Sequence, residues 1–450
     1  MDKKTYYFVG IGGIGMSAIA RYLNNNGHKV YGYDRTRTQL SIQLEEEGMQ
    51  IIYEDNPNHL PENIDLAIYT PAIPVDNQIL KTIKERNIKL EKRAIALSEI
   101  IKEKKVIAIS GTHGKTTTSG LLAHLLHSSK IGCSAFLGGI TNNYSTNMLY
   151  NANSDYVIVE ADEYDRSFLQ LTPYVSAITS ISADHLDIYE NKENLEQAFA
   201  QFANQTKQEG RIFLKKGLSI EPKDSIKTHT YSLTDIESEY YAWNIRVSKE
   251  SYYFDYHTPE KVYYDMQMTY PGIHNIENAI LALSIAINLG VSEYELRASL
   301  KTFKGMKRRF DLQLKTQDTI YYDDYAHHPE EIEATITSLK HLHPNKRICG
   351  IFQPHLYSRT RDFADEFARA LEHLDDIILI PIYPAREEPI VGITSKTILH
   401  KINKMDKYHV TKEQLFPLLS ALQPQLLVTL GAGDIDQLVE PITQFLKDNE

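Results

Sequence analysis

Short apolar runs rich in β-branched and aromatic residues alternate with longer amphipathic stretches in the first part of the chain. Residues 5–10 and 28–34 have the composition of strands, and residues 16–27 and 39–48 have the spacing of helices. Strands and helices in regular alternation predict a parallel, doubly wound sheet. The same pattern starts again at residues 104–126, where an apolar strand leads through a glycine-bearing turn into a long helix. The chain therefore contains a second α/β unit.

The composition of the chain changes between about residues 205 and 270, where tyrosine-rich alternating stretches predict antiparallel hairpins attached to the middle segment. A third series of strands and helices begins at residue 318 and continues to the C-terminus. A chain of 450 residues is too long for one compact core. We therefore predict three α/β domains, over residues 1–103, 104–312 and 313–450.

The formal net charge of −11 argues against a nucleic-acid-binding surface, which needs an excess of lysine and arginine. The two cysteines, Cys133 and Cys349, lie far apart in the sequence and indicate neither a disulfide framework nor a zinc site. No apolar run approaches the ~20 residues that a membrane helix needs. We expect a soluble cytoplasmic protein with no nucleic-acid or membrane partner.

The first strand ends in a glycine-rich turn that leads directly into a helix, with glycines at Gly10, Gly12, Gly13 and Gly15. Backbone N–H groups at such a helix N-terminus can hold a diphosphate where side chains would crowd it. Asp34, at the end of the next strand, completes the fingerprint of a dinucleotide site. The same fingerprint is typical of NAD-dependent oxidoreductases, and glycines can also simply form a tight strand–helix junction. The pattern thus predicts a diphosphate without identifying the ligand that carries it.

A second turn also lies between a strand and a helix, and it comprises Gly111, Thr112, His113, Gly114, Lys115, Thr116 and Thr117. A phosphate-binding loop lies at this place in a nucleotide-binding sheet. We expect Lys115 to neutralise the β and γ phosphates of ATP, and the Thr116 hydroxyl to bind Mg²⁺. The spacing is shorter than in the usual P-loop, because Ile109 stands where that motif has its first glycine. The strand before the turn and the helix after it nevertheless favour nucleotide binding.

Two further apolar runs of the middle segment lead to metal-binding residue types. The strand at residues 156–160 ends at Glu160, which is well placed to bind Mg²⁺, because strands of a nucleotide-binding sheet present metal ligands at their carboxyl ends. A solvated acidic loop is the alternative interpretation. The run at residues 175–182 leads to His185 at the same sheet edge, where a neutral imidazole could bind a second Mg²⁺.

The start of the third segment carries paired carboxylates and two adjacent histidines. Asp324 ends its first strand, and a contact with a nucleotide accounts for it best, because paired carboxylates are costly without a cation or hydroxyl partner. His327 and His328 precede Pro329, which is typical of the first turn of a helix. Arg309, in a basic run just before, either belongs to a solvated hinge or supplies a guanidinium to phosphate.

These motifs follow one another over nearly the full length of the chain, in the order GTHGKTTT, EADEYDRSF, DHLD, GIHNIENA, KRRF, DDYAHHP, QPHLYSRT and GAGDI. In this form and order they resemble the Mur ligases, which use ATP to join an amino acid to a carboxylate on a UDP-linked sugar. The resemblance implies an N-terminal Rossmann-like domain for the UDP group, a central P-loop ATPase-type α/β domain, and a C-terminal Rossmann-like domain that closes over the site with the amino acid. Two phosphate-binding turns in one chain would then have separate ligands, UDP-sugar at the first and ATP at the second.

The resemblance also implies roles for individual residues. Asn278 and Arg309 would contact ATP, and Asp324 would approach its ribose and phosphates. His355 and Arg359 would hold the carboxylate of the incoming amino acid. The catalytic set that the resemblance implies is Lys115, Glu160, His185 and Arg309.

Two departures from the pattern of the family concern the amino acid. Relatives that add later residues carry a carboxylated lysine about fifteen positions after the DHLD histidine, where this chain has Ala200. Its absence resembles the members that add L-alanine to UDP-N-acetylmuramate in peptidoglycan synthesis. Leu356 stands where some relatives have an arginine, so the carboxylate would rest more heavily on Arg359.

The implied reaction proceeds through an acyl phosphate. The lactyl carboxylate attacks the γ-phosphate of ATP, the amine of L-alanine attacks the activated carbonyl, and Mg²⁺, Lys115 and Arg309 stabilise the negative charge. A base is expected to take the proton of the amine, and His327, His328 and His355 are equal candidates. A ligase that reattaches a recycled murein peptide to the same UDP-sugar and an NAD-dependent oxidoreductase are the alternative functions.

Overall fold

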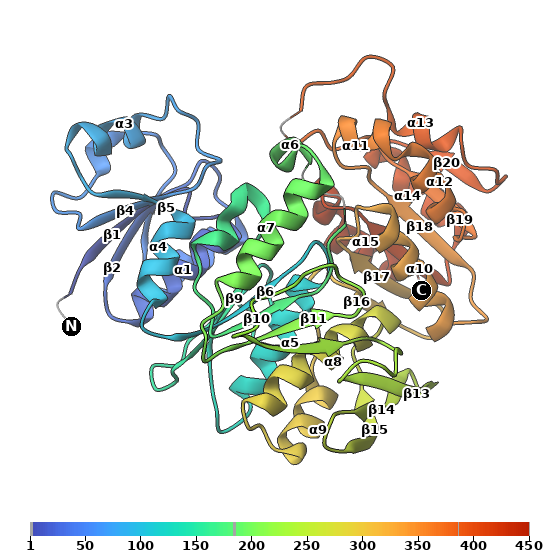
Figure 1. Cartoon of the computed structure of the whole chain (residues 1–450). Coiled ribbons are helices and arrows are strands. Elements are labelled where there is room, and N and C mark those ends of the chain that lie inside the picture. Colours follow the sequence, from blue (N-terminus) through green and yellow to red (C-terminus); the bar gives the residue numbers. More distant parts are fainter. Residues whose placement is uncertain (1–2, 183–185, 386, 450) are drawn as a thin grey trace. The chain divides into compact units, whose positions relative to one another are not determined.

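The computed structural model describes residues 3–182, 186–385 and 387–449, whose helices and strands are shown in Figure 1. The chain forms two compact units. Unit 1 consists of Met1–Trp243, Asp255–Met266 and Glu277–Phe303, and unit 2 consists of Asn244–Phe254, Gln267–Ile276 and Lys304–Glu450. Both units are built on sheets whose strands are mainly parallel. The predicted α/β class is confirmed, whereas the domain boundaries predicted at residues 103 and 312 stay predictions. Among the described residues, no helix has the length and apolar composition needed to cross a bilayer.

The N-terminal sheet of unit 1 has five parallel strands in the order β3-β2-β1-β4-β5. These strands are β1 (Thr5–Val9), β2 (Lys29–Tyr33), β3 (Gln50–Ile52), β4 (Leu66–Tyr69) and β5 (Leu90–Lys92). One face of β1 packs with α1 (Ile14–Asn25), α2 (Gln39–Glu46) and α4 (Arg93–Ile101), and the other packs with α3 (Gln78–Glu85) near η1 (Pro57–His59). The strand order reverses beside β1, so the turn after β1 lies where open α/β sheets bind ligands.

The central sheet of unit 1 has seven strands in the order β12-β11-β10-β6-β9-β7-β8. These strands are β6 (Lys105–Ser110), β7 (Ser134–Phe136), β8 (Met148–Leu149), β9 (Tyr156–Glu160), β10 (Val175–Ile178), β11 (Arg211–Lys215) and β12 (Lys227–Tyr231). The associated helices are α5 (Lys115–His127), η2 (Tyr164–Gln170), α6 (Leu186–Tyr189), α7 (Lys192–Asn204), α8 (Ile273–Asn288) and α9 (Glu293–Thr302). Strand β6 pairs with β9 on one side and β10 on the other, so the carboxyl ends of all three lie at one edge.

The prediction of antiparallel hairpins between about residues 205 and 270 is wrong for β11 and β12, which are parallel members of the central sheet. The rest of this region forms a separate three-stranded sheet of β13 (Tyr241–Ser248), β14 (Ser251–His257) and β15 (Val262–Met268), in sequential order. An alternating pattern shows which residues face a core, but the direction of the neighbouring strand depends on the connection between strands. Here α7 provides the crossover that keeps β11 parallel to β10.

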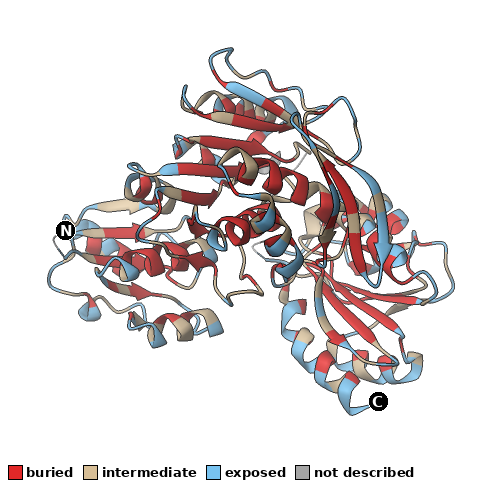
Figure 2. Ribbon diagram, turned by 90° about the horizontal axis from the view of Figure 1, so that it is seen from below, coloured by how far each residue is buried: buried red, intermediate tan, exposed pale blue. Residues whose placement is uncertain are grey.

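Unit 2 contains a six-stranded sheet in the order β16-β17-β21-β18-β19-β20, in which only the edge strand β16 is antiparallel. Its strands are β16 (Asp311–Lys315), β17 (Ile320–Asp324), β18 (Ile348–Phe352), β19 (Asp376–Leu379), β20 (Lys407–His409) and β21 (Leu426–Leu430). Its helices are α10 (Pro329–Leu342), α11 (Tyr357–Asp362), α12 (Ala364–Leu371), α13 (Ser395–Leu399), α14 (Lys412–Leu422), η3 (Asp434–Leu438) and α15 (Val439–Asp448). The central strands β17, β18 and β21 are buried along their whole length (Figure 2).

Candidate functional site

The second glycine turn joins β6 to α5 at the edge where the carboxyl ends of the central strands meet. Gly111 has φ +126° and Gly114 has φ +84°, in the left-handed region that glycine adopts without strain. A Cβ atom on Gly111 would lie 2.7 Å from the Ser180 nitrogen, and one on Gly114 would lie 2.6 Å from Asn278 Oδ1. The turn therefore presents backbone groups at the start of a helix, where an anion is stabilised.

Polar side chains from neighbouring elements hold this turn in place. The Ser180 hydroxyl, just after β10, accepts a hydrogen bond from the His113 nitrogen at 2.8 Å and lies 2.9 Å from the Thr112 hydroxyl. The Thr118 hydroxyl donates to Asn278 Oδ1 at 3.2 Å. Asn278, on α8, thus lies beside the turn to which the sequence assigned it, and its role toward ATP stays a prediction.

Lys115 is the first residue of α5, and its ammonium group bends back over the turn. Its Nζ donates to the Gly111 carbonyl at 2.6 Å and pairs with the Glu163 carboxylate at 2.9 Å. Burial opposes its charge, but the carboxylates of Glu163, Asp162 and Glu160 outweigh that effect and raise the pKa of Lys115. A cation is therefore held next to the backbone groups that would receive a phosphate.

Thr116 and Glu160, the two predicted Mg²⁺ ligands on described residues, are in direct contact. The Thr116 hydroxyl donates to Glu160 Oε1 at 2.8 Å, and the Gly138 nitrogen donates to Glu160 Oε2 at 2.9 Å. A hydroxyl and a carboxylate are hard oxygen ligands, and Mg²⁺ is usually held by one or two such groups together with waters and substrate phosphate. This pair fits Mg²⁺, while the predicted ligand His185 lies outside the described residues. Thr117 is buried in the first turn of α5.

The first glycine turn, after β1, is held by the carboxylate that the sequence assigned to the ligand. The Gly12 nitrogen donates to Asp34 Oδ2 at 2.8 Å, and the Thr36 nitrogen donates to Oδ1 at 3.1 Å. Gly10 has φ +92°, and its nitrogen donates to the Tyr33 carbonyl at 2.8 Å. Asp34 thus fixes the shape of the turn, and Gly13 follows as the N-cap of α1.

Arg93, the first residue of α4, lies against this turn and was missed by the sequence analysis. A Cβ atom on Gly15 would lie only 2.4 Å from Arg93 Nη1, so the guanidinium occupies the space that the glycine leaves. Within the described part of the chain, no carboxylate pairs with Arg93. A cation beside the positive end of a helix is unfavourable without an anion between them, which favours a diphosphate here. No sequence motif marks Arg93.

In unit 2, Asp324 is fully engaged by its own neighbours. Its carboxylate accepts hydrogen bonds from the Phe310 nitrogen at 2.9 Å, the Ala326 nitrogen at 2.8 Å and the Thr335 hydroxyl at 3.2 Å. Burial raises its pKa to about 6, which the charge of Arg309 partly opposes. Asp324 therefore anchors the chain on both sides of β17, and its predicted contact with a nucleotide is not tested by this geometry.

The basic run before β16 surrounds an aromatic ring. The guanidinium of Arg309 lies 4.7 Å from the centroid of the Tyr325 ring, and that of Arg308 lies 5.3 Å from it. Arg308 also pairs with Asp323 at 3.1 Å. The run is therefore packed within unit 2. Of its two arginines, Arg309 is the one that the sequence predicts to contact phosphate.

The predicted amino-acid residues lie beside one of the candidate bases. The rings of His327 and His355 are 5.9 Å apart between centroids. Burial lowers the pKa of His327 to about 4, and the positive charge of Arg359 contributes in the same direction. His327, His355 and Arg359 thus form one cluster at the carboxyl ends of β17 and β18.

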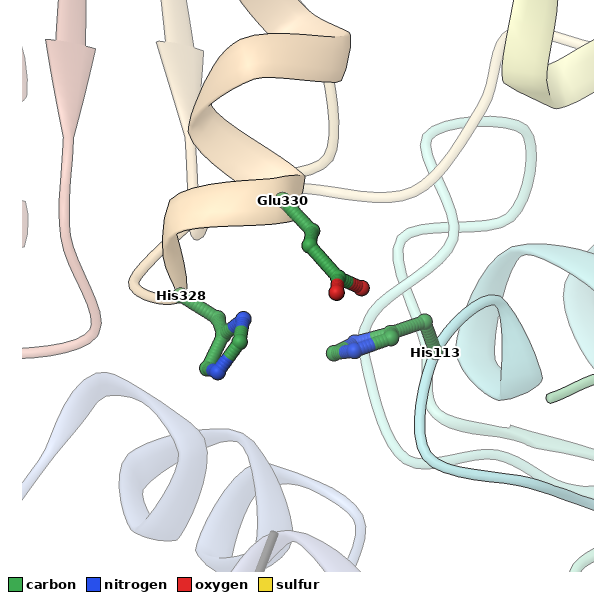
Figure 3. A group of neighbouring side chains, drawn as sticks. All are labelled: His113, His328 and Glu330. Carbon is green, nitrogen blue, oxygen red and sulfur yellow. The ribbon is translucent and has the colours of Figure 1, made fainter. Parts of the chain in front are cut away.

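His328 is the next residue along the chain after His327. Its ring packs against Phe363 at 5.1 Å, and the residue is the N-cap of α10. Figure 3 shows His328 and Glu330 at the start of that helix, and it also shows His113 on the turn before α5. Because Phe363 directly follows α11, which carries Arg359, the ring of His328 also packs beside this helix, and all three histidines stay candidates for the base.

Three family models match successive parts of the chain. They are described as the Mur ligase family catalytic domain, over residues 5–105, the Mur ligase middle domain, over residues 109–286, and the Mur ligase glutamate ligase domain, over residues 308–433. The chain belongs to the Mur ligase family. The resemblance found in the sequence is thereby confirmed.

Relatives within the Mur ligase family match over the whole chain. A UDP-N-acetylmuramate–L-alanine ligase of Parabacteroides distasonis is 44% identical and covers 98% of this chain and 96% of its own length. The enzyme of the same name from Christiangramia forsetii is 43% identical, with 98% of each chain covered. The crystal structure of UDP-N-acetylmuramate-alanine ligase from Thermotoga maritima is 26% identical, covers 99% of this chain and 100% of its own, and has a TM-score of 0.84.

Proposed function

We propose that the protein is an ATP-dependent ligase that joins L-alanine to the lactyl carboxylate of UDP-N-acetylmuramate. The products are UDP-N-acetylmuramoyl-L-alanine, ADP and phosphate. The reaction belongs to peptidoglycan synthesis and takes place in the cytoplasm. The observation that carries this proposal is the second turn, where Lys115 and the pair of Thr116 and Glu160 surround a backbone phosphate cradle. The names of the full-length relatives support the choice of L-alanine.

At the second turn, the backbone N–H groups at the start of α5 bind the phosphates of ATP, and the Lys115 ammonium exchanges its contact with Glu163 for the β and γ phosphates. Thr116 and Glu160 hold Mg²⁺, which neutralises charge on the transferred phosphoryl group when bound. Lys115 and the Mg²⁺ that Thr116 and Glu160 would hold act by placing positive charge where negative charge develops. The γ-phosphate is then open to attack by the lactyl carboxylate, and the product of that attack is an acyl phosphate.

At the first turn, the backbone of Gly10 to Gly15 binds the diphosphate of the UDP-sugar, and Arg93 supplies a guanidinium. In unit 2, His355 and Arg359 bind the carboxylate of L-alanine. Burial lowers the pKa of His327 to about 4, so its imidazole is uncharged at neutral pH but is a weak base. His327, His328 and His355 stay equal candidates for the group that takes the proton of the amine. We keep the roles that the sequence assigned to four further residues. His185 binds a second Mg²⁺, Asn278 and Arg309 contact ATP, and Asp324 approaches its ribose and phosphates.

A phosphate-release assay tests this function. The purified protein receives ATP, Mg²⁺ and UDP-N-acetylmuramate, together with either L-alanine or the murein tripeptide. We expect release with L-alanine and none above background with the tripeptide. Release with the tripeptide alone would establish the peptide-recycling ligase instead. Tight binding of NAD at the first turn, measured by titration, would favour the oxidoreductase.

A further inference from the structure

Helix α11 (Tyr357–Asp362) carries Arg359 and begins two residues after His355, yet it has no side-chain cap of its own. Its N-cap residue is Leu356, at φ +70°, and a leucine side chain accepts no hydrogen bond. The first N–H groups of any helix lack partners within the helix. Water or an acceptor from another part of the chain satisfies them.

Glu387 supplies that acceptor from 29 residues further along the chain. Its Oε2 accepts a hydrogen bond from the Ser358 nitrogen at 2.9 Å, and its Oε1 accepts one from the Ser358 hydroxyl. Burial raises the pKa of Glu387, but these bonds and one from the Tyr357 nitrogen outweigh it, and the net pKa is lowered. A carboxylate at the N-terminus of a helix is also favoured by the helix dipole.

The same segment holds His355. The ring of Tyr383 stacks on that of His355, with centroids 5.7 Å apart and an interplanar angle of 23°. The Leu356 nitrogen donates to the Tyr383 carbonyl at 3.0 Å, and the Tyr383 nitrogen donates to the Pro354 carbonyl at 2.9 Å. Tyr383 and Glu387 thus fasten the two ends of the stretch from Pro354 to Ser358.

We propose that Glu387 is a positioning residue for the amino-acid substrate, whose carboxylate fixes the first turn of α11 and so the direction in which Arg359 points. The proposal rests on the proposed function, in which Arg359 binds the carboxylate of L-alanine. The side-chain contacts described for Glu387 are all with the segment that carries His355 and Arg359. Its effect is therefore confined to one of the three substrates.

The test compares Glu387→Gln with Glu388→Gln, since Glu388 is the adjacent exposed carboxylate. Glu387→Gln keeps the size of the side chain but removes its charge and one of its acceptor oxygens. A small misplacement of a substrate-binding group can cost up to about a hundredfold, so we expect the KM for L-alanine to rise about tenfold. The KM values for ATP and UDP-N-acetylmuramate should stay within about twofold of those of the wild type. Glu388→Gln should change none of the three.

Ser358→Ala provides a second variant, which removes one hydrogen bond to Glu387 and leaves its charge. It should raise the KM for L-alanine less than Glu387→Gln, and the double variant should show less than the product of the two effects, because both changes break the same contact. An unchanged KM for L-alanine in Glu387→Gln, or an equal rise for all three substrates, would overturn the proposal. If the wild-type enzyme released no phosphate with L-alanine, the result would contradict the proposed function as well as this inference.

Discussion

Asn147 joins the helix after the first glycine turn to the central sheet, and its replacement by alanine should destabilise unit 1. The side chain is fully buried just before β8. Its Nδ2 donates to the Ile14 carbonyl at 2.6 Å and to the Ser17 hydroxyl at 2.9 Å, and its Oδ1 accepts from Arg21 Nη1. Arg21 is 4% exposed and also pairs with Glu47 at 2.7 Å. One amide thus satisfies three groups on α1.

The expected loss follows from the groups that Asn147→Ala leaves behind. A buried polar group without a partner costs about 1–3 kcal/mol, and more when it is charged. Arg21 keeps its ion pair with Glu47, and the Ser17 hydroxyl keeps a hydrogen bond to the Ile14 carbonyl at 3.0 Å, so the effect is smaller than three full penalties. We expect unit 1 to lose about 3 kcal/mol. Because α1 carries the first turn, the KM for the UDP-sugar should rise as well.

The assay is scanning calorimetry of the whole protein, in which the transition of unit 1 should move to lower temperature. Asn153→Ala is the matched control, because Asn153 is exposed and its side chain makes no contact of this kind. The double variant Arg21→Met with Asn147→Leu should lose less than the sum of the single changes, since no buried charge is then left unpaired. Glu47 loses its partner in this variant, but its side chain is 37% exposed and stays hydrated. If Asn147→Ala melts like Asn153→Ala, or the double variant loses the full sum, the argument fails.

Three further predictions concern the two turns and the titration of unit 2. Lys115→Ala should lower phosphate release by at least about 10³-fold, because the cation at the phosphates is lost. The circular dichroism spectrum should stay that of the wild type. Full activity of this variant would exclude the second turn as the ATP site. Gly15→Ala should raise the KM for UDP-N-acetylmuramate and leave that for ATP unchanged, because the added Cβ would overlap the guanidinium that lies against the turn; equal changes in both would contradict this. The pKa values of His274 and His327 are lowered from 6.5 to about 4, so the unfolded chain binds protons that the native state excludes between those pH values. Stability of unit 2 should therefore fall as the pH drops from 6.5 to 4, partly offset by Asp324, whose raised pKa of about 6 acts in the opposite direction. Chemical denaturation across this range measures the slope, and a slope of the opposite sign would show that the histidines are accessible to water.

The second turn could be predicted from the sequence because its parts are fixed locally. A strand followed by glycines and a helix determines where the backbone N–H groups, Lys115 and Thr116 lie. The prediction that Glu160 belongs to the same site also required that its strand, β9, lies next to β6. The parallel pairing of β6 with β9 meets this condition. Arg93 and Asn147 could not be found in this way. Each is a single residue whose partner lies on another helix, so its contact depends on how whole elements pack.

The carboxylates at strand ends show a second limit of the sequence. Asp34 was assigned to a ligand because it completes a dinucleotide fingerprint, and Asp324 because a charged group at such a place needs a partner. In the structure, backbone N–H groups of adjacent turns supply partners for both. A carboxylate that shapes a binding turn and one that touches the ligand occupy the same sequence position, so the motif cannot separate these roles. Only the direction of the hydrogen bonds distinguishes them.

The contacts at the second turn divide into those that ATP can leave intact and those that it must replace. Ser180 holds the backbone of the turn by accepting a hydrogen bond from the His113 nitrogen, and Asn278 accepts one from the Thr118 hydroxyl in α5, so neither contact involves the Lys115 ammonium. Lys115, by contrast, is engaged by the Glu163 carboxylate, which must be given up before the ammonium reaches a phosphate oxygen. Removal of that competing partner by Glu163→Gln should therefore tighten the binding of ATP without Mg²⁺, because a neutral amide holds the ammonium less strongly. The rigid backbone and the exchangeable side chain together make binding selective for a ligand with enough negative charge to displace a carboxylate.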